Sequence, residues 1–547
     1  AYVAADRHAD AIGLVEERME RAGAAPNLYA ELGALHFDAG DLDAAHRAWA
    51  DAIAAAPQDP SAYRQVYAQQ VAKRLYPEAR DALLQGRERL GDPDLFRVEL
   101  AELFARTEGY AEALQEWAAL VAQDEQQLHF VRSRIGRLLD QAGAAEAFAD
   151  ALDRLIREEP LVLAYRDLSA WLNAERGDFE AALDATRALD RLRGAEGQAL
   201  FAFAESALAA DAFGPARKAF DLILQNHPES PAAPLALLGS AVLHEQEGLA
   251  LGEQAVDGDG LRVPAPHFDR ALERYRQVLE RYPNHPRYPF ALHRLAQLQK
   301  DVFRDYAEAE RLLNEVLTRF ARGAAAAEAR LDLGELALMR GDLHTARRHF
   351  TAVEENERIG EAAERARLEL ARLELYEGAF DTALARAQAM NRNTATDVAN
   401  DAIALKLLVT EGQGPDSLNV PLRTYARAQL LLRQHRPADA LAAADSVLAT
   451  APQHALADDA AFLRAEALRA ARRPAEALSV LAALPQRYPE SHLADRALFL
   501  AAEIQERDLG DADAAMAAYA DLLARYPGSL LAPEARARIR RLRGDGV

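Results

Sequence analysis

Alanines recur along the chain at a nearly constant interval, and this interval limits the possible folds more than any other feature. The first set has steps of 34 or 35 residues and contains Ala11, Ala45, Ala79, Ala113, Ala147, Ala182 and Ala216. The later sets have steps of 37 or 38 residues and contain Ala271, Ala309, Ala346 and Ala383, then Ala440, Ala477 and Ala515. A period of this length indicates stacked supersecondary units that each contact their neighbours, in place of one globular core.

Two further positions repeat with these alanines. A bulky apolar residue often follows four residues later, as at Trp49, Leu83, Trp117, Phe220, Tyr275, Leu313, Phe350, Leu481 and Tyr519. Proline often follows twelve residues later, as at Pro57, Pro228, Pro283, Pro452, Pro489 and Pro527. The small residue permits two helices to cross closely, the large one fills the space toward the next unit, and the proline ends a helix. The pattern therefore predicts one helical hairpin in each repeat.

The clearest repeat places Tyr29, Leu32, Gly33, Gly40, Ala45, Trp49, Ala52 and Pro57 where the tetratricopeptide repeat (TPR) has its signature residues, and a second has Leu333, Gly334, Gly341, Ala346 and Phe350. The chain resembles the TPR family over nearly its whole length. The resemblance implies an all-α solenoid, a right-handed superhelix of about fourteen hairpins. The second half also resembles the TPR units of bacterial cell-envelope proteins through its RYPNHP, RYPESH and RYPGSL phrases.

Two surplus segments divide the array. We expect a TPR array with a 34-residue period over 1–247, an inserted loop over 248–267, an array with a 37-residue period over 268–390, an inserted helix and loop over 391–420, a third array over 421–528 and a basic capping helix over 529–547. Asp257 and Asp259 begin a DGDG phrase that lacks the later ligands of a calcium loop, so a solvated turn is expected. Ile403 and Leu407 give the second insertion the apolar face of an amphipathic helix.

Composition excludes several classes of protein. The chain has no cysteine, which excludes disulfides, thiolate metal sites and cysteine nucleophiles. Its formal net charge of −22 disfavours nucleic acid as a partner. No apolar run is long enough to span a bilayer, and no signal peptide is visible. Because Ala11 occupies a second-helix position, a helix is expected before Ala1, removed with an export signal or missing from a shortened start. We expect a periplasmic or cell-surface location, with the cytoplasm as the alternative.

No group of residues in the sequence predicts catalysis. The chain has no HExxH, no phosphate-binding glycine loop, no GxSxG and no dinucleotide fingerprint. His454 shares a helical face with Asp458 and Asp459, and His492 with Asp495, but such spacings are common in helices. We therefore expect a protein that is not an enzyme, that needs no cofactor and that binds neither zinc nor calcium stoichiometrically.

Large apolar residues on the first helices of several hairpins suggest a groove for partners. In TPR proteins these helices line the concave face, which here places Phe201, Leu331, Met339, Leu368 and Tyr376 in an apolar groove for a peptide. The alternative is that they pack within their own hairpins. The lysines of a peptide-carboxylate clamp are absent from these positions.

The basic end of the chain suggests a second class of function. Arg538, Arg540 and Arg541 lie near the C-terminus of an otherwise acidic molecule. A polar capping helix whose arginines complement the helix dipole accounts for them, and so does contact with an acidic end of another copy. The sequence thus predicts a non-catalytic protein–protein interaction scaffold, with a self-assembling subunit that stacks head to tail as the alternative. The partner, the process and the oligomeric state are not predicted.

Overall fold

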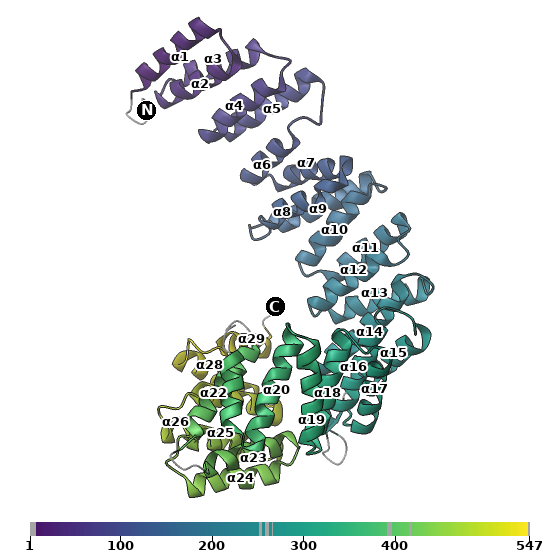
Figure 1. Cartoon of the computed structure of the whole chain (residues 1–547). Coiled ribbons are helices and arrows are strands. Elements are labelled where there is room, and N and C mark those ends of the chain that lie inside the picture. The colour runs from purple at the N-terminus through teal and green to yellow at the C-terminus, as the bar shows by residue number, and fades with distance from the viewer. Residues whose placement is uncertain are drawn as a thin grey trace. The chain divides into compact units, whose positions relative to one another are not determined.

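The computed structural model describes residues 7–250, 254–256, 262–264, 266–390, 397–414 and 418–544. Within these ranges the regular structure is 29 α-helices, one short two-stranded sheet, and single turns of other helix types (Figure 1). The chain divides into two compact units, Ala1–Leu243 and His244–Val547, both built from stacked antiparallel helix pairs. Among the described residues, none of the helices has both the length and the apolar character needed to cross a membrane.

The first unit is helical throughout its described part. Its helices are α1 (His8–Ala22), α2 (Pro26–Asp38), α3 (Leu42–Ala55), α4 (Pro60–Ala72), α5 (Tyr76–Leu90), α6 (Arg97–Arg106), α7 (Tyr110–Gln123), the 3₁₀ turn η2 (Glu125–Gln127), α8 (Leu128–Gly136), α9 (Ala144–Glu158), α10 (Leu163–Glu175), α11 (Phe179–Arg193), α12 (Gln198–Ala209) and α13 (Phe213–Asn226). Helix α14 (Ala232–Ala250) contains the boundary between the two units.

The second unit continues the same architecture with two interruptions. Its helices are α15 (Pro266–Arg281), α16 (Tyr288–Asp301), α17 (Tyr306–Arg319), α18 (Ala324–Met339), α19 (Leu343–Asn356), α20 (Glu361–Glu377), α21 (Phe380–Met390), α22 (Asp397–Gly412), α23 (Val420–Arg433), α24 (Pro437–Thr450), α25 (Ala457–Ala470), α26 (Pro474–Arg487), α27 (Ala494–Glu503), α28 (Ala512–Arg525) and α29 (Ala532–Arg543). The π-helical segment η3 (Ile504–Leu509) prolongs α27.

The repeating alanines lie where two helices cross, as the sequence predicts. Ala45, Ala216, Ala346 and most of the others are completely buried. The repeat at α9 differs, because Ala147 is only half-buried while Ala144 is completely buried with Phe148 four residues later. Ala144 therefore holds the crossing position in this hairpin, and the alanine spacing alone gives a register that is wrong by three residues.

The turn inside each hairpin follows one local rule. The residue five positions before the crossing alanine has a positive φ in the turns at Gly40, Arg74, Glu108, Gly177, Asp211, Arg304, Gly341, Gly378, His435, Arg472 and Gly510. The next residue is often an aspartate that caps the second helix, as when Asp342 Oδ1 accepts a hydrogen bond of 2.9 Å from the Thr345 amide. This left-handed residue reverses the chain between the paired helices.

The first insertion contains the β-structure of the described chain. Strand β1 (Gln254–Val256) pairs antiparallel with β2 (Arg262–Pro264), and Ala255 lies opposite Val263. The sequence predicts only a loop here, because three-residue strands are too short to show an alternating pattern. Asp257 and Asp259, considered above for calcium, lie outside the described residues.

The second insertion adds a single helix between two hairpins. Helix α22 occupies the segment predicted as an amphipathic helix and packs on α20 and α21. The buried residues of this region form one cluster to which α20, α21, α22, α23 and α25 all contribute, including Leu368, Phe380, Val409, Leu422 and Leu463. The insertion thus shares one core with the hairpins that precede and follow it.

Candidate functional site

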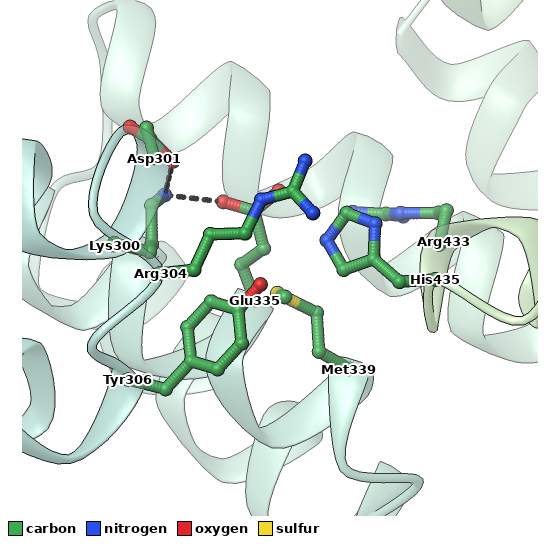
Figure 2. A pocket seen from close by; sticks show the side chains of 8 residues that line it. All are labelled: Lys300, Asp301, Arg304, Tyr306, Glu335, Met339, Arg433 and His435. Atoms are coloured by element: carbon green, nitrogen blue, oxygen red, sulfur yellow. Dashed lines mark hydrogen bonds and ion pairs between the residues drawn. The ribbon is translucent and has the colours of Figure 1, made fainter. Parts of the chain in front are cut away.

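A polar pocket of about 240 Å³ lies in the second unit, where α23 meets α16, α17 and α18 (Figure 2). The end of α16, the turn that follows it and the start of α17 together supply four of its residues. Helix α18 supplies two, and the end of α23 with the following turn supplies two. They are Lys300, Asp301, Arg304 and Tyr306, then Glu335 and Met339, then Arg433 and His435.

The pocket exists because α23 lies against hairpins much earlier in the chain. The Gln434 side-chain amide donates a hydrogen bond of 3.4 Å to the Leu338 carbonyl, across 96 residues of sequence. Leu430 of α23 packs against the core cluster of α18 and α20. These contacts bring the α23–α24 turn to the C-terminal end of α18.

Two lining residues occupy the left-handed position of their turns. Arg304 and His435 both have φ near 56°, and each lies five residues before a crossing alanine. Figure 2 shows both side chains reaching toward the same space, from the α16–α17 turn and the α23–α24 turn. Because Arg74, Glu108 and Asp211 take the same conformation elsewhere, this strain is general to the hairpins and does not mark the pocket.

Lys300 forms the base of the pocket and is fully engaged. Its Nζ lies 2.6 Å from Asp332 Oδ1, 2.6 Å from Glu335 Oε2 and 3.4 Å from Asp301 Oδ1. Burial alone would lower the pKa of Lys300, but Asp332, Glu335 and Asp301 outweigh it and raise that pKa. Lys300 therefore stays charged, and its charge is balanced by the protein itself.

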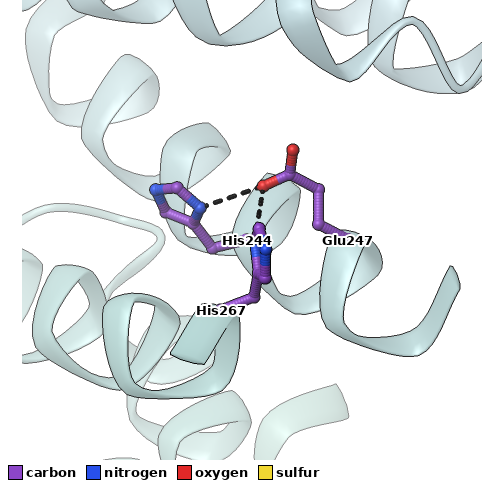
Figure 3. Close-up of side chains that lie close together, drawn as sticks. All are labelled: His244, Glu247 and His267. Carbon is purple, nitrogen blue, oxygen red and sulfur yellow. Dashed lines mark hydrogen bonds and ion pairs between the residues drawn. The ribbon is translucent and has the colours of Figure 1, made fainter. Parts of the chain in front are cut away.

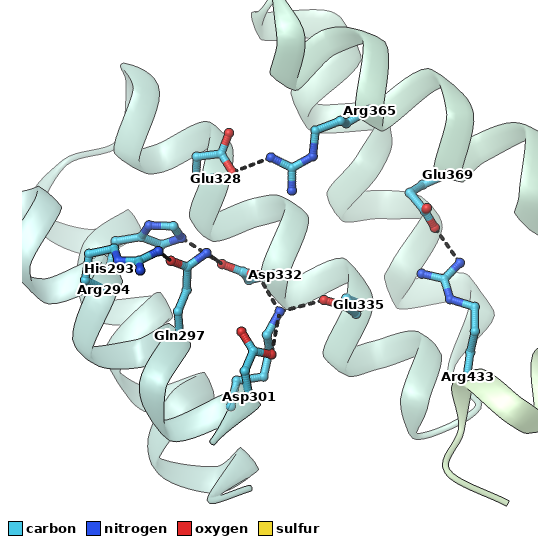
Figure 4. Close-up of polar contacts among 11 residues, drawn as sticks. His293, Arg294, Gln297, Asp301, Glu328, Asp332, Glu335, Arg365, Glu369 and Arg433 are labelled. Carbon is cyan, nitrogen blue, oxygen red and sulfur yellow. Dashed lines mark hydrogen bonds and ion pairs between the residues drawn. The ribbon is translucent and has the colours of Figure 1, made fainter. Parts of the chain in front are cut away.

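Asp332 connects this base to the interior between α16 and α18 (Figure 4). Its Oδ2 lies 2.7 Å from His293 Nε2, and its side chain is only 6% exposed. Burial opposes ionisation, yet the hydrogen bond to His293 and the charge of Lys300 lower the pKa of Asp332. The pair of Lys300 and Asp332 is thus a buried ion pair with supporting hydrogen bonds, the form in which such pairs are tolerated.

Arg433 is also neutralised by the protein. Its guanidinium lies 2.7 Å from Glu369 Oε2, and Arg372 pairs with the other oxygen of the same carboxylate at 2.7 Å. Burial alone would lower the pKa of Arg433, but Tyr376 and Glu369 outweigh burial, so the pKa is raised. The residue therefore anchors α23 to α20.

Arg304 differs from the other two cations of the pocket. It is exposed, and within the described residues it forms no ion pair. Partial desolvation and the charge of Arg304 lower the pKa of His435, against the opposing effect of Glu335. The outer part of the pocket therefore offers an exposed guanidinium beside a neutral imidazole, while the carboxylates of Asp301 and Glu335 lie on the Lys300 side.

Two of the five residues predicted for the apolar groove are buried by the chain itself. Leu331 and Leu368 are 4% and 3% exposed, which contradicts the expectation that they face a partner. Leu430 of α23 contacts the cluster that holds Leu331, and α22 and α23 build the cluster that holds Leu368. Helices α22 and α23 thus cover the side of α18 and α20 that carries Leu331 and Leu368. The period of the repeats does not predict this packing.

The three other groove residues keep partial exposure. Met339 lines the pocket, and Tyr376 is half-buried between two core clusters. Phe201 belongs to the first unit, where its ring lies 6.2 Å from that of Phe220. The pocket thus contains one of the five predicted groove residues.

Among the arginines predicted for end contacts, Arg538 has a structural role. It is 7% exposed and pairs with Glu534 at 2.9 Å, Glu506 at 3.1 Å and Glu503 at 3.4 Å. These contacts tie α29 to α27 and η3, so Arg538 is not available to another copy. Arg540 and Arg541 are exposed.

The histidine–carboxylate pairs noted in the sequence have separate hydrogen-bond partners. His454 Nδ1 accepts a hydrogen bond of 3.2 Å from the Leu456 amide. Asp495 Oδ2 accepts one of 2.6 Å from the Ser529 hydroxyl. The first contact is local to the start of α25, and the second joins α27 to the segment that precedes α29.

The residues that matter in the pocket are absent from the sequence prediction. Lys300 and Asp332 are charged residues on helices α16 and α18. The repeat pattern predicts that a charged residue on such a helix faces solvent, and it does not predict a buried ion pair. Arg304 and His435 stand at the turn position where glycine is the least strained residue. A charged residue at this turn position could have indicated the pocket in the sequence. Charged residues occupy the same position in other turns, however, so the position does not distinguish Arg304 and His435.

Comparison with known proteins supports the repeat assignment. Sequence models of the tetratricopeptide repeat match residues 302–356, 425–492 and 496–529. A search of curated proteins finds no match to the chain.

Two of the solved structures that resemble the chain do so at low identity. A tetratricopeptide repeat protein from Parabacteroides merdae ATCC 43184 is 15% identical, covers 56% of this chain and 98% of its own, and has a TM-score of 0.32. Yeast Tom70 is 13% identical, covers 94% and 95%, and has a TM-score of 0.28. TM-scores this low carry no argument about function. The matched segments, all within the second unit, are tetratricopeptide repeats.

Proposed function

We propose that the chain is a non-catalytic scaffold that binds other proteins, and that the pocket at Arg304 receives an acidic side chain of the partner. The observation that carries this proposal is the guanidinium of Arg304, which faces the pocket with no ion pair among the described residues. Tetratricopeptide repeats typically mediate protein–protein interactions, which supports the class of function.

The chemistry of the pocket favours a carboxylate over other groups. Arg304 supplies a planar set of N–H donors, and His435 and Tyr306 add further donors at the rim. A charge-assisted hydrogen bond to arginine contributes about 1.5–3 kcal/mol. Lys300 and Arg433 are already neutralised by Asp332 and Glu369, so they shape the site while Arg304 attracts the ligand.

The test is selection of peptides that bind the intact chain, followed by affinity measurements. A random displayed library is selected on the wild-type chain, and the selected peptide is titrated by calorimetry into wild type, Arg304→Glu and Arg472→Glu. Arg472 is the matched control, because it is an exposed arginine with φ of 61° in the equivalent α25–α26 turn but does not line the pocket. We expect the peptides to share an acidic residue and Arg304→Glu to weaken binding at least tenfold. Equal effects of both substitutions, or selected peptides without acidic residues, would contradict the proposal.

The alternative function is self-assembly by head-to-tail stacking, which the exposed Arg540 and Arg541 on α29 support. These two residues give the C-terminal helix exposed positive charge, whereas Arg538 of the same helix forms ion pairs within the chain. A heterologous contact of this kind forms rings or open filaments. Light scattering of wild type and an Arg540→Glu, Arg541→Glu variant tests this alternative.

We also propose a periplasmic or extracellular location. The complete absence of cysteine supports it, because an exported chain without thiols forms no stray disulfides. Fractionation of the source cells with an antibody to this chain tests the location. Recovery in the cytoplasmic fraction alone would contradict it.

A further inference from the structure

Two histidines and a glutamate meet at the start of the second unit (Figure 3). His244 and Glu247 lie one helical turn apart on α14, and His267 lies near the start of α15. Glu247 Oε2 is 3.2 Å from His244 Nδ1 and 3.0 Å from His267 Nδ1. The ligand atoms of all three residues lie within 4.8 Å of one another.

Close packing of the two helices holds these side chains together. Gly248 follows Glu247, and Phe268 follows His267. A Cβ at Gly248 would lie 2.7 Å from Phe268 Cζ, so only glycine permits this approach. Phe268 is completely buried. The three polar groups therefore converge at a rigid crossing and not on a loose surface.

The cluster is nearly enclosed. The side chains of His244 and Glu247 are 7% and 8% exposed, and that of His267 is 22% exposed. Both Nδ1 atoms point at one carboxylate oxygen, so the arrangement either shares two N–H donors with that oxygen or surrounds a cation with three ligand atoms. The partial exposure of His267 leaves one side of the cluster accessible from solvent.

We propose that His244, Glu247 and His267 bind one divalent transition-metal ion, with Zn²⁺ the ion that fits best. Two imidazoles and one carboxylate form a ligand set that zinc uses when a fourth position stays open to water. With Zn–N and Zn–O distances of about 2.0–2.2 Å, tetrahedral ligand atoms lie roughly 3.3–3.5 Å apart. The distances around Glu247 Oε2 need to lengthen by only a few tenths of an ångström.

The next acidic residue on α14 is engaged elsewhere. Glu245 accepts a hydrogen bond of 2.9 Å from the Tyr275 hydroxyl and pairs with Arg294. It therefore neither competes for the ion nor completes its coordination. This leaves Glu247 as the carboxylate of the site and water as the fourth ligand.

A second buried histidine–carboxylate pair shows what a site without metal looks like. His293 and Asp332 lie 2.7 Å apart, but Lys300 Nζ occupies the third place, 2.6 Å from Asp332 Oδ1. The ammonium already supplies the positive charge there and would repel a cation. At Glu247 the second imidazole, that of His267, stands beside the carboxylate.

The ion would fasten α14 to α15 across the inserted segment. His244 and Glu247 precede the β1–β2 hairpin, and His267 follows it. Binding to the folded chain alone stabilises it by mass action, so zinc should raise the melting temperature. The sequence predicts no zinc, because the insertion places His267 20 residues after Glu247, outside any short motif.

The test measures zinc content and thermal stability of the full-length chain. Wild type, His267→Ala, Glu247→Gln and the control His492→Ala are equilibrated with Zn²⁺, passed over a desalting column, and analysed by plasma mass spectrometry and thermal melting. His492 is an exposed histidine of the same unit. We expect one zinc per chain and a raised melting temperature in wild type and His492→Ala, with both effects lost in the other two variants.

Two outcomes would overturn the proposal. One is a wild-type chain that retains no zinc, which would show that the three residues are only hydrogen-bonded. The other is equal retention in His267→Ala, which would place the zinc elsewhere. Because substitution can disturb packing, the wild-type chain is also loaded with Co²⁺. Intense visible d–d bands of four-coordinate cobalt are expected, and the weak spectrum of hydrated Co²⁺ would contradict the site.

Discussion

At the residue scale, the fold depends on pairs of a glycine and an aromatic ring at helix crossings. Gly33 faces Trp49, Gly239 faces Phe220, and Gly334 faces Phe350. In each pair a Cβ on the glycine would overlap the ring, so the ring occupies the volume that a side chain would need. This explains why the sequence prediction is accurate here, since both residues of the pair are fixed by the same contact.

We expect Gly334→Ala to destabilise the second unit by about 2 kcal/mol, because the added Cβ would lie 2.7 Å from Phe350 Cζ in a filled core. Gly13→Ala is the control. It lies within α1 with no heavy atom within 4 Å of the added Cβ, so helix propensity should stabilise that variant by roughly 0.5–1 kcal/mol. Denaturant unfolding measures both, and equal effects would show that the crossing is loosely packed.

Asp459 gives the stability a pH dependence. It is 8% exposed, and burial, with the charges of Asp458 and Glu411, raises its pKa to about 7 against the opposing effect of Arg496. The folded pKa lies above the unfolded value, so the folded state is favoured while the carboxyl is protonated. This stability is present below the unfolded-state pKa of 3.8 and is lost as pH rises through the folded-state pKa of about 7.

We therefore expect Asp459→Asn to stabilise the chain at pH 8, where wild type carries a buried charge, and to change little at pH 4. The difference between the two pH values should be on the order of 4 kcal/mol, from a pKa displaced by about three units. Urea unfolding of both proteins across this range measures it. A difference that does not vary with pH would show that Asp459 titrates normally.

At the element scale, the hairpin turn is the unit whose geometry repeats most closely. The same register position is left-handed whether it holds Gly341, Arg304 or Arg472. The geometry of the two paired helices imposes this conformation. The residue type at the position changes only the free-energy cost of adopting it. Glycine at this position was therefore readable from the sequence, whereas the arginines were not recognised as turn residues.

We expect Arg472→Gly to stabilise the chain by roughly 0.5–1 kcal/mol, because it removes the cost of a left-handed side-chain residue while adding some backbone entropy to the unfolded state. The reverse change, Gly341→Ala at φ of 83°, should destabilise by about 1 kcal/mol. Thermal and denaturant melts measure both variants. Stabilisation by Gly341→Ala would contradict this account of the turn.

Helix α22 shows why an element cannot be interpreted from its own sequence alone. Its amphipathic face predicts a helix, and the structure has one at Asp397–Gly412. What that face covers depends on residues of α20, α21 and α23, the helices that precede and follow it in the chain. The burial of Leu368 follows from this packing, which is why the predicted groove failed there.

At the scale of the whole molecule, self-assembly makes a prediction separate from partner binding. If copies stack end to end, the mass measured by light scattering should rise with concentration, and Arg540→Glu combined with Arg541→Glu should abolish the rise. Both arginines are exposed, so the double substitution should leave the fold intact. Tyr376→Ala is the control distant in sequence and should leave assembly unchanged. A constant monomer mass in wild type would remove this alternative.

The sequence by itself determined the repeat, the helical hairpins and the crossing residues, because each depends on contacts within one unit or between adjacent units. Its right-handed superhelix stays a prediction. Only the tertiary structure decided which inner faces are covered, that Arg538 is used internally, and that Lys300, Arg304 and His435 share one pocket. It also brought His244, Glu247 and His267 together. These features depend on contacts across insertions, where neither the alanine interval nor any short motif fixes the register.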